Sequence, residues 1–175
     1  GRIVSIDGKR LCGSGTQDKK AIVHMVSAWC NSNNMVLGQV KTDDKSNEIT
    51  AIPELLKLLN IKGCTVTIDA MGCQKDIADK IIEMEGDYVL AVKGNQGNLL
   101  DDIEEAFKET ASSSLQSSTS LEIGHGRIEK RSCDVITDTD WICNLQEWKG
   151  LKSLIRIKAE RTNKARGEKQ PECRY

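Results

Sequence analysis

Apolar residues in this chain fall first into short runs and then into regularly spaced stripes. Three apolar runs, separated by polar turns, predict consecutive strands over 3–7, 21–30 and 35–41. Two stripes at helical spacing follow, and they predict helices over 49–59 and 74–85. Strands joined by short turns form an antiparallel meander, so the start of the chain is expected to be a three-stranded hairpin unit.

Each of these helices leads into another apolar strand, at 63–69 and at 87–93, and a third helix is expected from 98 to about 110. Strand–helix–strand connections of this kind are right-handed parallel crossovers. The elements therefore predict an α/β fold with a mixed five-stranded sheet, the first strand in its centre and helices flanking it. This order of strands is the ribonuclease H-like arrangement.

The chain after the third helix has a different character. Residues 112–120 are rich in serine and are expected to form a linker. Alternating strand patterns over 120–136 and 151–161, a loop or short helix between them and a polar, hairpin-like tail over 163–175 predict a β-rich insertion after the third helix. We expect two domains: a truncated ribonuclease H-like core over 1–111, and the linker with the β-strand insertion over 112–175.

Two of the predicted strands run directly into a carboxylate. Ile3–Ile6 leads into Asp7, and Cys64–Ile68 leads into Asp69. If these strands are parallel neighbours, both carboxylates emerge at one edge of the sheet, where a hard divalent cation would relieve their mutual repulsion. The alternative is that each aspartate only caps a turn.

The composition narrows the classes of function. The 175 residues are enough for a domain with a core, and a formal net charge of −1 argues against a strongly basic nucleic-acid module but leaves room for a local basic face. Three Trp, two Tyr and one Phe are too few for a platform that stacks single strands. Seven cysteines without a Cys-x-x-Cys pair indicate reduced thiols rather than a structural zinc site. We expect no membrane segment and no signal peptide, and the ends of the chain suggest a fragment of a longer protein.

Four motifs occur in a fixed order: Ile6-Asp7-Gly8-Lys9, Thr67-Ile68-Asp69-Ala70-Met71-Gly72-Cys73-Gln74, Tyr88-Val89-Leu90-Ala91-Val92-Lys93-Gly94-Asn95-Gln96 and His125-Gly126-Arg127-Ile128-Glu129. In these motifs, and along essentially its whole length, the chain resembles the H-repeat-associated insertion-sequence transposases of bacteria. That family belongs to the DDE superfamily, whose catalytic core is ribonuclease H-like. One departure is Cys12, where the family has arginine.

The resemblance implies an enzyme that cleaves DNA and transfers strands with the help of two divalent ions, Mg²⁺ or Mn²⁺. Asp7 and Asp69 take the positions of the first and second catalytic carboxylates and would be metal ligands. In related transposases the third carboxylate is a glutamate on a late helix, which would follow Tyr175. Glu129 is the substitute that this chain offers. Without the late helix we expect the fragment to be inactive alone.

The resemblance also implies partners and a location. The partner would be double-stranded DNA, both transposon ends and target, and the complete enzyme would form a homodimer on DNA in the bacterial cytoplasm, associated with the nucleoid. The residues expected to contact DNA are polar or basic: Lys9, Lys93, Asn95, Gln96, His125, Arg127, Lys130 and Arg131. With Arg156, Lys158 and Arg161, the basic residues of the insertion are expected to form one face able to meet a polyanion.

Two other functions remain open at this point. One is a decayed transposase that keeps only a DNA-binding or interaction role. The other is an ATP phosphotransferase of the actin and sugar-kinase type, which also uses aspartates at strand ends. That chemistry needs Ser or Thr hydroxyls at the phosphates, and Asp7-Gly8-Lys9 and Asp69-Ala70-Met71-Gly72 do not supply them.

Overall fold

The computed structural model describes residues 2–11, 23–42, 48–124, 127–163 and 169–175. The chain divides into two compact units, each described here by itself. The first consists of Gly1–Ala91 with Gln146–Gly150, and the second of Val92–Leu145 with Leu151–Tyr175. Ser46 and Asn47, from which the sequence predicts an N-terminal cap for the first helix, lie outside the described residues.

The first unit contains a five-stranded sheet. Its strands are β1 (Arg2–Leu11), β2 (Val23–Cys30), β3 (Met35–Lys41), β4 (Cys64–Ile68) and β5 (Asp87–Leu90), in the order β3-β2-β1-β4-β5. The pairs β1–β2 and β2–β3 are antiparallel, whereas β1–β4 and β4–β5 are parallel. The predicted mixed sheet with the first strand in its centre is thus confirmed.

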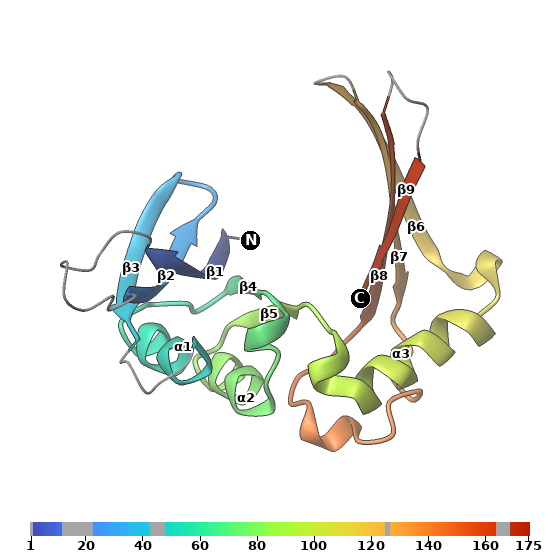
Figure 1. The fold of residues 1–175 in the computed structure, drawn as a ribbon. Coiled ribbons are helices and arrows are strands. Elements are labelled where there is room, and N and C mark those ends of the chain that lie inside the picture. Colours follow the sequence, from blue (N-terminus) through green and yellow to red (C-terminus); the bar gives the residue numbers. More distant parts are fainter. Residues whose placement is uncertain (1, 12–22, 43–47, 125–126, 164–168) are drawn as a thin grey trace. The chain divides into compact units, whose positions relative to one another are not determined.

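Two helices cover one face of this sheet, α1 (Glu48–Lys57) and α2 (Lys75–Glu83) (Figure 1). Their apolar stripes bury Leu55, Leu56, Ile77 and Ile81, which are at most 1% exposed, against the inward-facing residues of the strands. Because side chains alternate along a strand, the residues between these inward positions face the other side of the sheet. Burial of one stripe per helix explains why helical spacing in the sequence locates both helices.

Strand β5 is shorter than expected. The sequence predicts a strand to residue 93, but β5 ends at Leu90, which pairs with Ile68, the last residue of β4. The amide of Ala91 still donates to the Ile68 carbonyl (3.2 Å), and the pairing stops there because β4 turns into η1 (Ala70–Gly72). An apolar run thus continues past the point where its neighbouring strand ends.

The segment Gln146–Gly150 packs in the first unit although it follows far along the chain. It includes part of the short helix η4 (Leu145–Glu147), and its Trp148 is only 4% exposed. The Tyr88 hydroxyl donates to the carbonyl of Lys149 (3.1 Å). Burial raises the pKa of Tyr88 to about 12, so this hydroxyl stays protonated and keeps its hydrogen for that bond.

The second unit combines one helix with a four-stranded antiparallel sheet of order β6-β7-β8-β9. Its elements are η2 (Gly94–Gln96), α3 (Gly97–Glu109), η3 (Ser112–Ser114), β6 (Gln116–Gly124), β7 (Arg127–Ile136), β8 (Leu154–Asn163) and β9 (Lys169–Arg174). Figure 1 shows these strands as long, curved arrows that rise side by side. The amide of Val92 donates to the carbonyl of Tyr175 (2.9 Å), which joins the first and last residues of the unit.

The serine-rich segment is not a linker, as the sequence suggested, but forms η3 and the first half of β6. Strand β6 pairs with β7 along its whole length, from Gln116 opposite Val135 to Gly124 opposite Arg127. Every residue of β6 is exposed, so the strand shows no apolar alternation. Its backbone hydrogen bonds hold it in place, and a sequence pattern of buried residues cannot detect such a strand.

A buried ion pair joins the second sheet to α3. Asp134, 8% exposed, accepts hydrogen bonds from Ser117 (2.7 Å) and from Nε (3.1 Å) and Nη2 (2.9 Å) of Arg156. Arg156 also donates to the carbonyl of Phe107 (3.3 Å), and its guanidinium lies 4.4 Å from the centre of the Phe107 ring. A partly buried charge is tolerated because hydrogen bonds and an opposite charge satisfy it.

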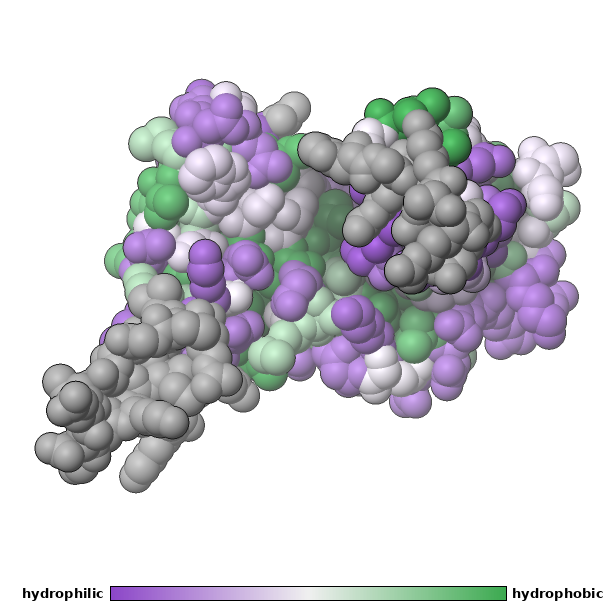
Figure 2. Space-filling model, turned by 45° about the horizontal axis from the view of Figure 1, so that its top comes forward, coloured by the Kyte–Doolittle hydropathy of each residue, from purple (hydrophilic) through white to green (hydrophobic). Residues whose placement is uncertain are grey.

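Hydrophobic residues also reach the surface among hydrophilic ones (Figure 2). In the first unit the exposed ones include Ile3, Trp29 and Val89, and in the second they include Leu121 and Ile123. None of the helices in the described ranges combines the length and the apolar character that crossing a bilayer requires.

We predict that Asp134→Asn lowers the stability of the chain by about 3 kcal/mol at pH 7, because it leaves Arg156 without its counter-charge. The bond from Ser117 and then the Arg156 guanidinium hold the pKa of Asp134 below its ordinary value. The carboxylate therefore stabilises the fold above the unfolded-state pKa, and this contribution is lost as pH falls through the lowered pKa. The stability gap between wild type and variant should narrow below about pH 4.

Thermal unfolding of both proteins between pH 7 and pH 3 measures this gap. Asp101→Asn is the matched control, since Asp101 is an exposed carboxylate of α3 and forms no ion pair among the described residues. Its melting temperature should follow the wild type at every pH. A gap for Asp134→Asn that stays constant down to pH 3 would contradict the prediction.

Candidate functional site

The two aspartates singled out by the sequence lie on neighbouring parallel strands. The last paired residues of β1 and β4 are Ile6 and Ile68, and Asp7 and Asp69 follow them directly. Ile6 and Ile68 are buried on the helix-covered face, whereas both aspartates are exposed. Adjacent strands are about 4.8 Å apart, so this register places the two aspartates in adjacent positions along the pair.

The environment of Asp7 differs from the expectation that β1 ends there. Strand β1 continues to Leu11 and stays paired with β2, with Asp7 opposite Ser27. On its other side β1 loses its partner, because β4 ends at Ile68. Asp7 thus lies on a strand fixed from one side and open from the other, which combines a rigid backbone with an accessible carboxylate.

A pair of hydroxyls one pleat before the aspartates shows how close side chains on this face come. Ser5 and Thr67 are register partners, and the Thr67 hydroxyl donates to the Ser5 hydroxyl (3.0 Å). The Ser5 hydroxyl donates in turn to the side-chain oxygen of Asn31 (3.1 Å). Asp7 and Asp69 each stand two residues further along the same face. The hydroxyl bond therefore holds the two strands together next to the carboxylates.

Asp69 also caps the short helix η1. Its Oδ1 accepts from the amide of Met71 (3.1 Å), and its carbonyl accepts from the amide of Gly72 (3.1 Å). The alternative reading of these aspartates as turn caps thus holds for Asp69. For Asp7, no described residue donates a hydrogen bond to the carboxylate. Capping fixes the orientation of Asp69 and occupies only one of its two oxygens.

Gly72 lets η1 pack closely beneath Asp69. Gly72 is buried, and a Cβ at this position would overlap the side chain of Ile68 and come within 2.9 Å of Ile52. The absence of a side chain therefore lets the turn lie directly on the apolar core. The position of Asp69 depends on this contact as well as on its own hydrogen bond.

Two further features of the site are the charge state of its contacts and a third carboxylate near Asp7. Neither Asp7 nor Asp69 belongs to any ion pair of the described residues. The carboxylate of Glu48, in the first turn of α1, occupies the space that a Cβ on Gly8 would take. It lies on the helix-covered side of β1, next in sequence to Asp7. Within the described ranges these groups do not form a cluster of three metal-binding side chains.

Two residues near this site were missed by sequence reasoning. Glu48 could have been noticed only as an acid at the start of a helix, and its position over Gly8 is a tertiary contact. Lys41 of β3 is the second, because the row Lys9–Met25–Lys41 places it on the same face as Lys9. Both lysines are exposed, and Lys9 stands two residues after Asp7 on the face of the aspartates.

Glu129 lies in the second unit, on β7, and is already bound to two arginines. Its Oε1 accepts from Nε of Arg161 (3.1 Å) and Nε of Arg131 (3.0 Å). The bond from Arg161 and then that from Arg131 hold the pKa of Glu129 below its ordinary value. These contacts account for Glu129 as part of the sheet, and its role as a third metal ligand stays a prediction.

The remaining expected DNA contacts are spread over several elements. Lys93 precedes η2, and Asn95 and Gln96 lie within it. His125 lies outside the described residues, and for Arg127 only the backbone is described. Their contact with DNA stays a prediction.

The prediction of a single basic face on the insertion is wrong. Lys130 and Lys158 lie in the rows Lys130–Glu160 and Ser132–Lys158, whereas Arg131 and Arg161 lie in the rows Arg131–Ala159 and Glu129–Arg161. Because neighbouring rows of a sheet point to opposite sides, the lysines and these arginines are on different faces. Arg156 is moreover bound to Asp134.

Some of the described cysteines are core residues. Cys30, Cys64 and Cys73 are buried, and burial raises the pKa of Cys73 to about 11. A buried thiol that stays protonated is a poor nucleophile and serves as a core residue.

Comparisons with known proteins identify the family of the chain. Residues 1–166 match the family described as the transposase DDE domain, and the chain belongs to this family.

The relatives are bacterial proteins with corresponding names. The chain is 54% identical over 158 residues to "Putative transposase YncI" of Escherichia coli O157:H7, covering 88% of this chain and 40% of that protein. It is 46% identical over 174 residues to "H repeat-associated putative transposase YhhI" of Escherichia coli K12, covering 97% of this chain and 46% of the relative. The chain thus spans about half the length of these relatives, and the predicted resemblance is confirmed.

Among solved structures, the chain aligns with a cryo-EM structure titled as a piggyBac transposase synaptic complex with hairpin DNA. The TM-score is 0.40 and the identity 12%, over 75% of this chain and 30% of that chain. This likeness is too weak to support an argument.

We predict that Gly72→Ala lowers stability by about 1–3 kcal/mol, because the added methyl group has no room against Ile68 and Ile52. The strain should also loosen η1 and weaken the hydrogen bond that the Met71 amide donates to the Asp69 carboxylate. Hydrogen exchange at the Met71 amide, together with thermal unfolding, measures both effects.

Gly97→Ala is the matched control, since a Cβ at Gly97 meets no atom within 4 Å and the residue lies in a helix. That variant should be neutral or slightly more stable. Equal melting temperatures for wild type and Gly72→Ala would show that the turn can move away from the core at no cost.

Proposed function

We propose that this chain is part of the catalytic domain of a DDE transposase, with a ribonuclease H-like core that supports metal-dependent DNA cleavage and strand transfer. The observation that carries the proposal is the parallel register of β1 and β4, which brings Asp7 and Asp69 to adjacent positions on an exposed face. Membership of the transposase DDE domain family supports it. The family match also leaves no reason to retain the actin-like or sugar-kinase-like alternative.

The donors at this site fit a hard divalent cation. Asp7 and Asp69 offer carboxylate oxygens, and no described lysine or arginine pairs with either of them. Mg²⁺ and Mn²⁺ prefer such oxygens and tolerate several bound waters. When bound, such ions activate an attacking oxygen and stabilise a leaving oxygen in phosphoryl transfer, with two ions in the complete enzyme.

The residues at and next to the site would each have a distinct part in holding the cation. Asp7 and Asp69 would supply the ligands, and the Met71 amide would orient the Asp69 carboxylate. The bond between Thr67 and Ser5 would keep the two strands in register beside them. Glu48 would add negative charge behind Asp7 without being a ligand.

The third carboxylate would come from outside these 175 residues. Glu129 would have to give up two arginine bonds to serve as a ligand, and the exchange of a satisfied ion pair is unfavourable. The relatives are about twice as long as the chain, which leaves room for another glutamate. The fragment alone would then bind a cation weakly and would not transfer strands.

The partner would be double-stranded DNA, both as transposon end and as target. A homodimer on DNA and a place in the bacterial cytoplasm near the nucleoid belong to the same proposal. Lys9 and Lys41, on the face of the aspartates, would contact phosphates next to the site, and Lys93, Asn95 and Gln96 would contribute from η2.

A second function has one observation in its favour. The described residues hold no third metal-binding side chain beside Asp7 and Asp69. A decayed transposase that keeps only DNA binding would show the same arrangement. The complete gene distinguishes the two, because an active enzyme needs a downstream helix with a glutamate.

We predict that Asp7→Asn and Asp69→Asn each abolish the weak Mn²⁺ binding of the 175-residue chain, because a single carboxylate cannot hold the ion. In the complete protein they should lower cleavage of transposon-end DNA by at least about 100-fold. Electron paramagnetic resonance of free Mn²⁺ measures the first effect, and a gel assay of cleaved DNA measures the second.

Asp87→Asn is the control, since Asp87 opens β5 opposite Thr65, at the other end of the same sheet. It should leave both measurements unchanged. Full cleavage by Asp7→Asn in the complete protein would exclude the proposed function. Strand transfer by the unaltered 175-residue chain would instead show that the third ligand is inside it.

A further inference from the structure

The two faces of the β6–β9 sheet carry different arrangements of charge. One face, called here the arginine face, holds Glu122, Glu129, Arg131, Arg161, Glu172 and Arg174. The opposite one, called the lysine face, holds Lys130, Ser132, Asp134, Arg156, Lys158, Glu160 and Lys169. The register of β6–β9 assigns each residue to its face.

The arginine face neutralises itself. Among its described side chains there are three arginines and three glutamates, and they form a continuous chain of ion pairs. Arg131 contacts Glu122 (3.6 Å) and Glu129 (3.0 Å), and Arg161 contacts Glu129 (3.1 Å) and Glu172 (3.8 Å). Arg174 forms the last of these ion pairs, with Glu172 (2.7 Å), and its hydrogen bond is the main reason that the pKa of Glu172 is lowered. These arginines have little charge left for another partner.

The lysine face keeps an excess of positive charge. Its described side chains include four cations and two carboxylates. Asp134 is already bound by Arg156 and Ser117, so its contact with Lys158 is long (3.8 Å), and Glu160 is paired with Lys169 (3.1 Å). Lys130 forms no ion pair with any residue that the structure describes. Lys130 and Lys158 are therefore the two cations of this face with the most charge to offer.

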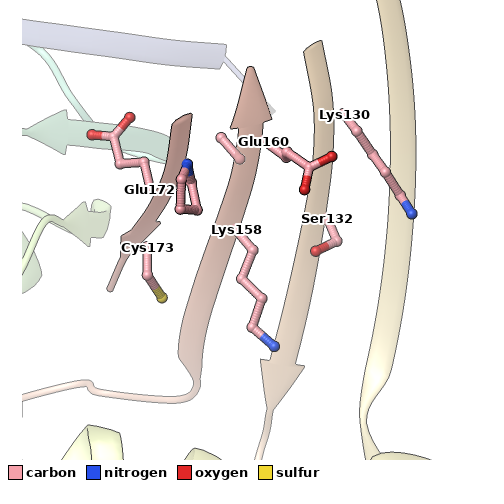
Figure 3. A pocket seen from close by; sticks show the side chains of 8 residues that line it. Lys130, Ser132, Lys158, Glu160, Glu172 and Cys173 are labelled. Carbon is pink, nitrogen blue, oxygen red and sulfur yellow. The ribbon is translucent and has the colours of Figure 1, made fainter. Parts of the chain in front are cut away.

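These two lysines border one open hollow. The hollow has a volume of about 520 Å³ and is lined by residues of β7, β8 and β9, among them Lys130, Ser132 and Lys158 and the acidic residues Glu160 and Glu172. Figure 3 shows Lys130 and Ser132 on one strand and Lys158 on the neighbouring strand. Lys130 pairs with Glu160, and Lys158 lies two residues before Glu160 on the same strand. The two lysines are therefore diagonal neighbours on one face, about 7–8 Å apart at the backbone.

We propose that the lysine face binds the phosphate backbone of duplex DNA through Lys130, Ser132 and Lys158, and that the arginine face does not bind DNA. This inference rests on the proposed function for its partner and specifies the surface that meets it. Lysine ammonium groups and a serine hydroxyl are common donors to phosphate oxygens. The residues that line the hollow include no aromatic side chain, which argues against single strands and against a protein partner anchored by aromatic groups.

The test is the affinity of the 175-residue chain for a duplex of unrelated sequence, measured by fluorescence anisotropy across a salt series in EDTA. Lys130→Ala/Lys158→Ala should weaken binding at low salt by about tenfold or more. It should also flatten the slope of log affinity against log salt by about two units, one for each lost phosphate contact. Lys130→Gln/Lys158→Gln should behave in the same way, and both variants should keep the melting temperature of the wild type.

Arg131→Ala is the matched control, because it removes a cation from the next position of the same strand but from the other face. Its salt slope should change by less than about half a unit. An unchanged slope in both lysine variants, or an equal loss in Arg131→Ala, would overturn the proposal. So would lysine variants that lose binding to poly-glutamate while duplex binding is unaffected, since the face would then belong to an acidic protein.

These outcomes are independent of the catalytic proposal, because EDTA removes the cation and Asp7 is not on this sheet. If the lysine slope falls as expected while Asp7→Asn still cleaves in the complete protein, the binding face stands and the catalytic proposal fails. If the slope is unchanged in the lysine variants while Asp7→Asn loses cleavage, the catalytic proposal stands and the proposed binding face is wrong.

Discussion

The parallel pairing of β1 with β4 is the constraint on which the candidate site depends. Burial of Val4, Ile6, Val66 and Ile68, at most 5% exposed, fixes which face of each strand meets the helices. A slip of one residue in either strand would turn its apolar residues to solvent and its aspartate into the core. The hydrophobic core thus determines the positions of Asp7 and Asp69, although neither aspartate contributes to it.

The second sheet depends on different forces. Its β6 is exposed throughout, and much of its cross-strand contact comes from charged rows rather than from apolar burial. Ion pairs at a solvated surface contribute little energy each, but they fix which rows face each other. One buried ion pair, Asp134 with Arg156, connects this open sheet to the apolar side of α3. Apolar burial thus fixes the strand register in the first unit, whereas pairing of charged residues contributes to it in the second.

The features that could be predicted are those that produce a pattern along the sequence. Apolar periodicity located β1 to β5 and the helices, since each buries one stripe, and strand-end carboxylates pointed to Asp7 and Asp69. The first half of β6 was taken for a linker because a strand exposed on both faces has no apolar pattern. The single basic face was wrong because Lys130 and Arg131, adjacent in sequence, point to opposite sides of a strand. Glu48 was missed because its contact with Gly8 exists only after α1 has packed.

The hydrogen bond between Val92 and Tyr175 has a consequence for how this protein can change. A segment whose first and last residues are neighbours can be lengthened, exchanged or removed with little distortion of the protein that carries it. Val92 and Tyr175 both belong to the second unit, which also holds the charged sheet. Related proteins could therefore differ in this sheet without disturbing the crossover that pairs β1 with β4, which itself tolerates few changes.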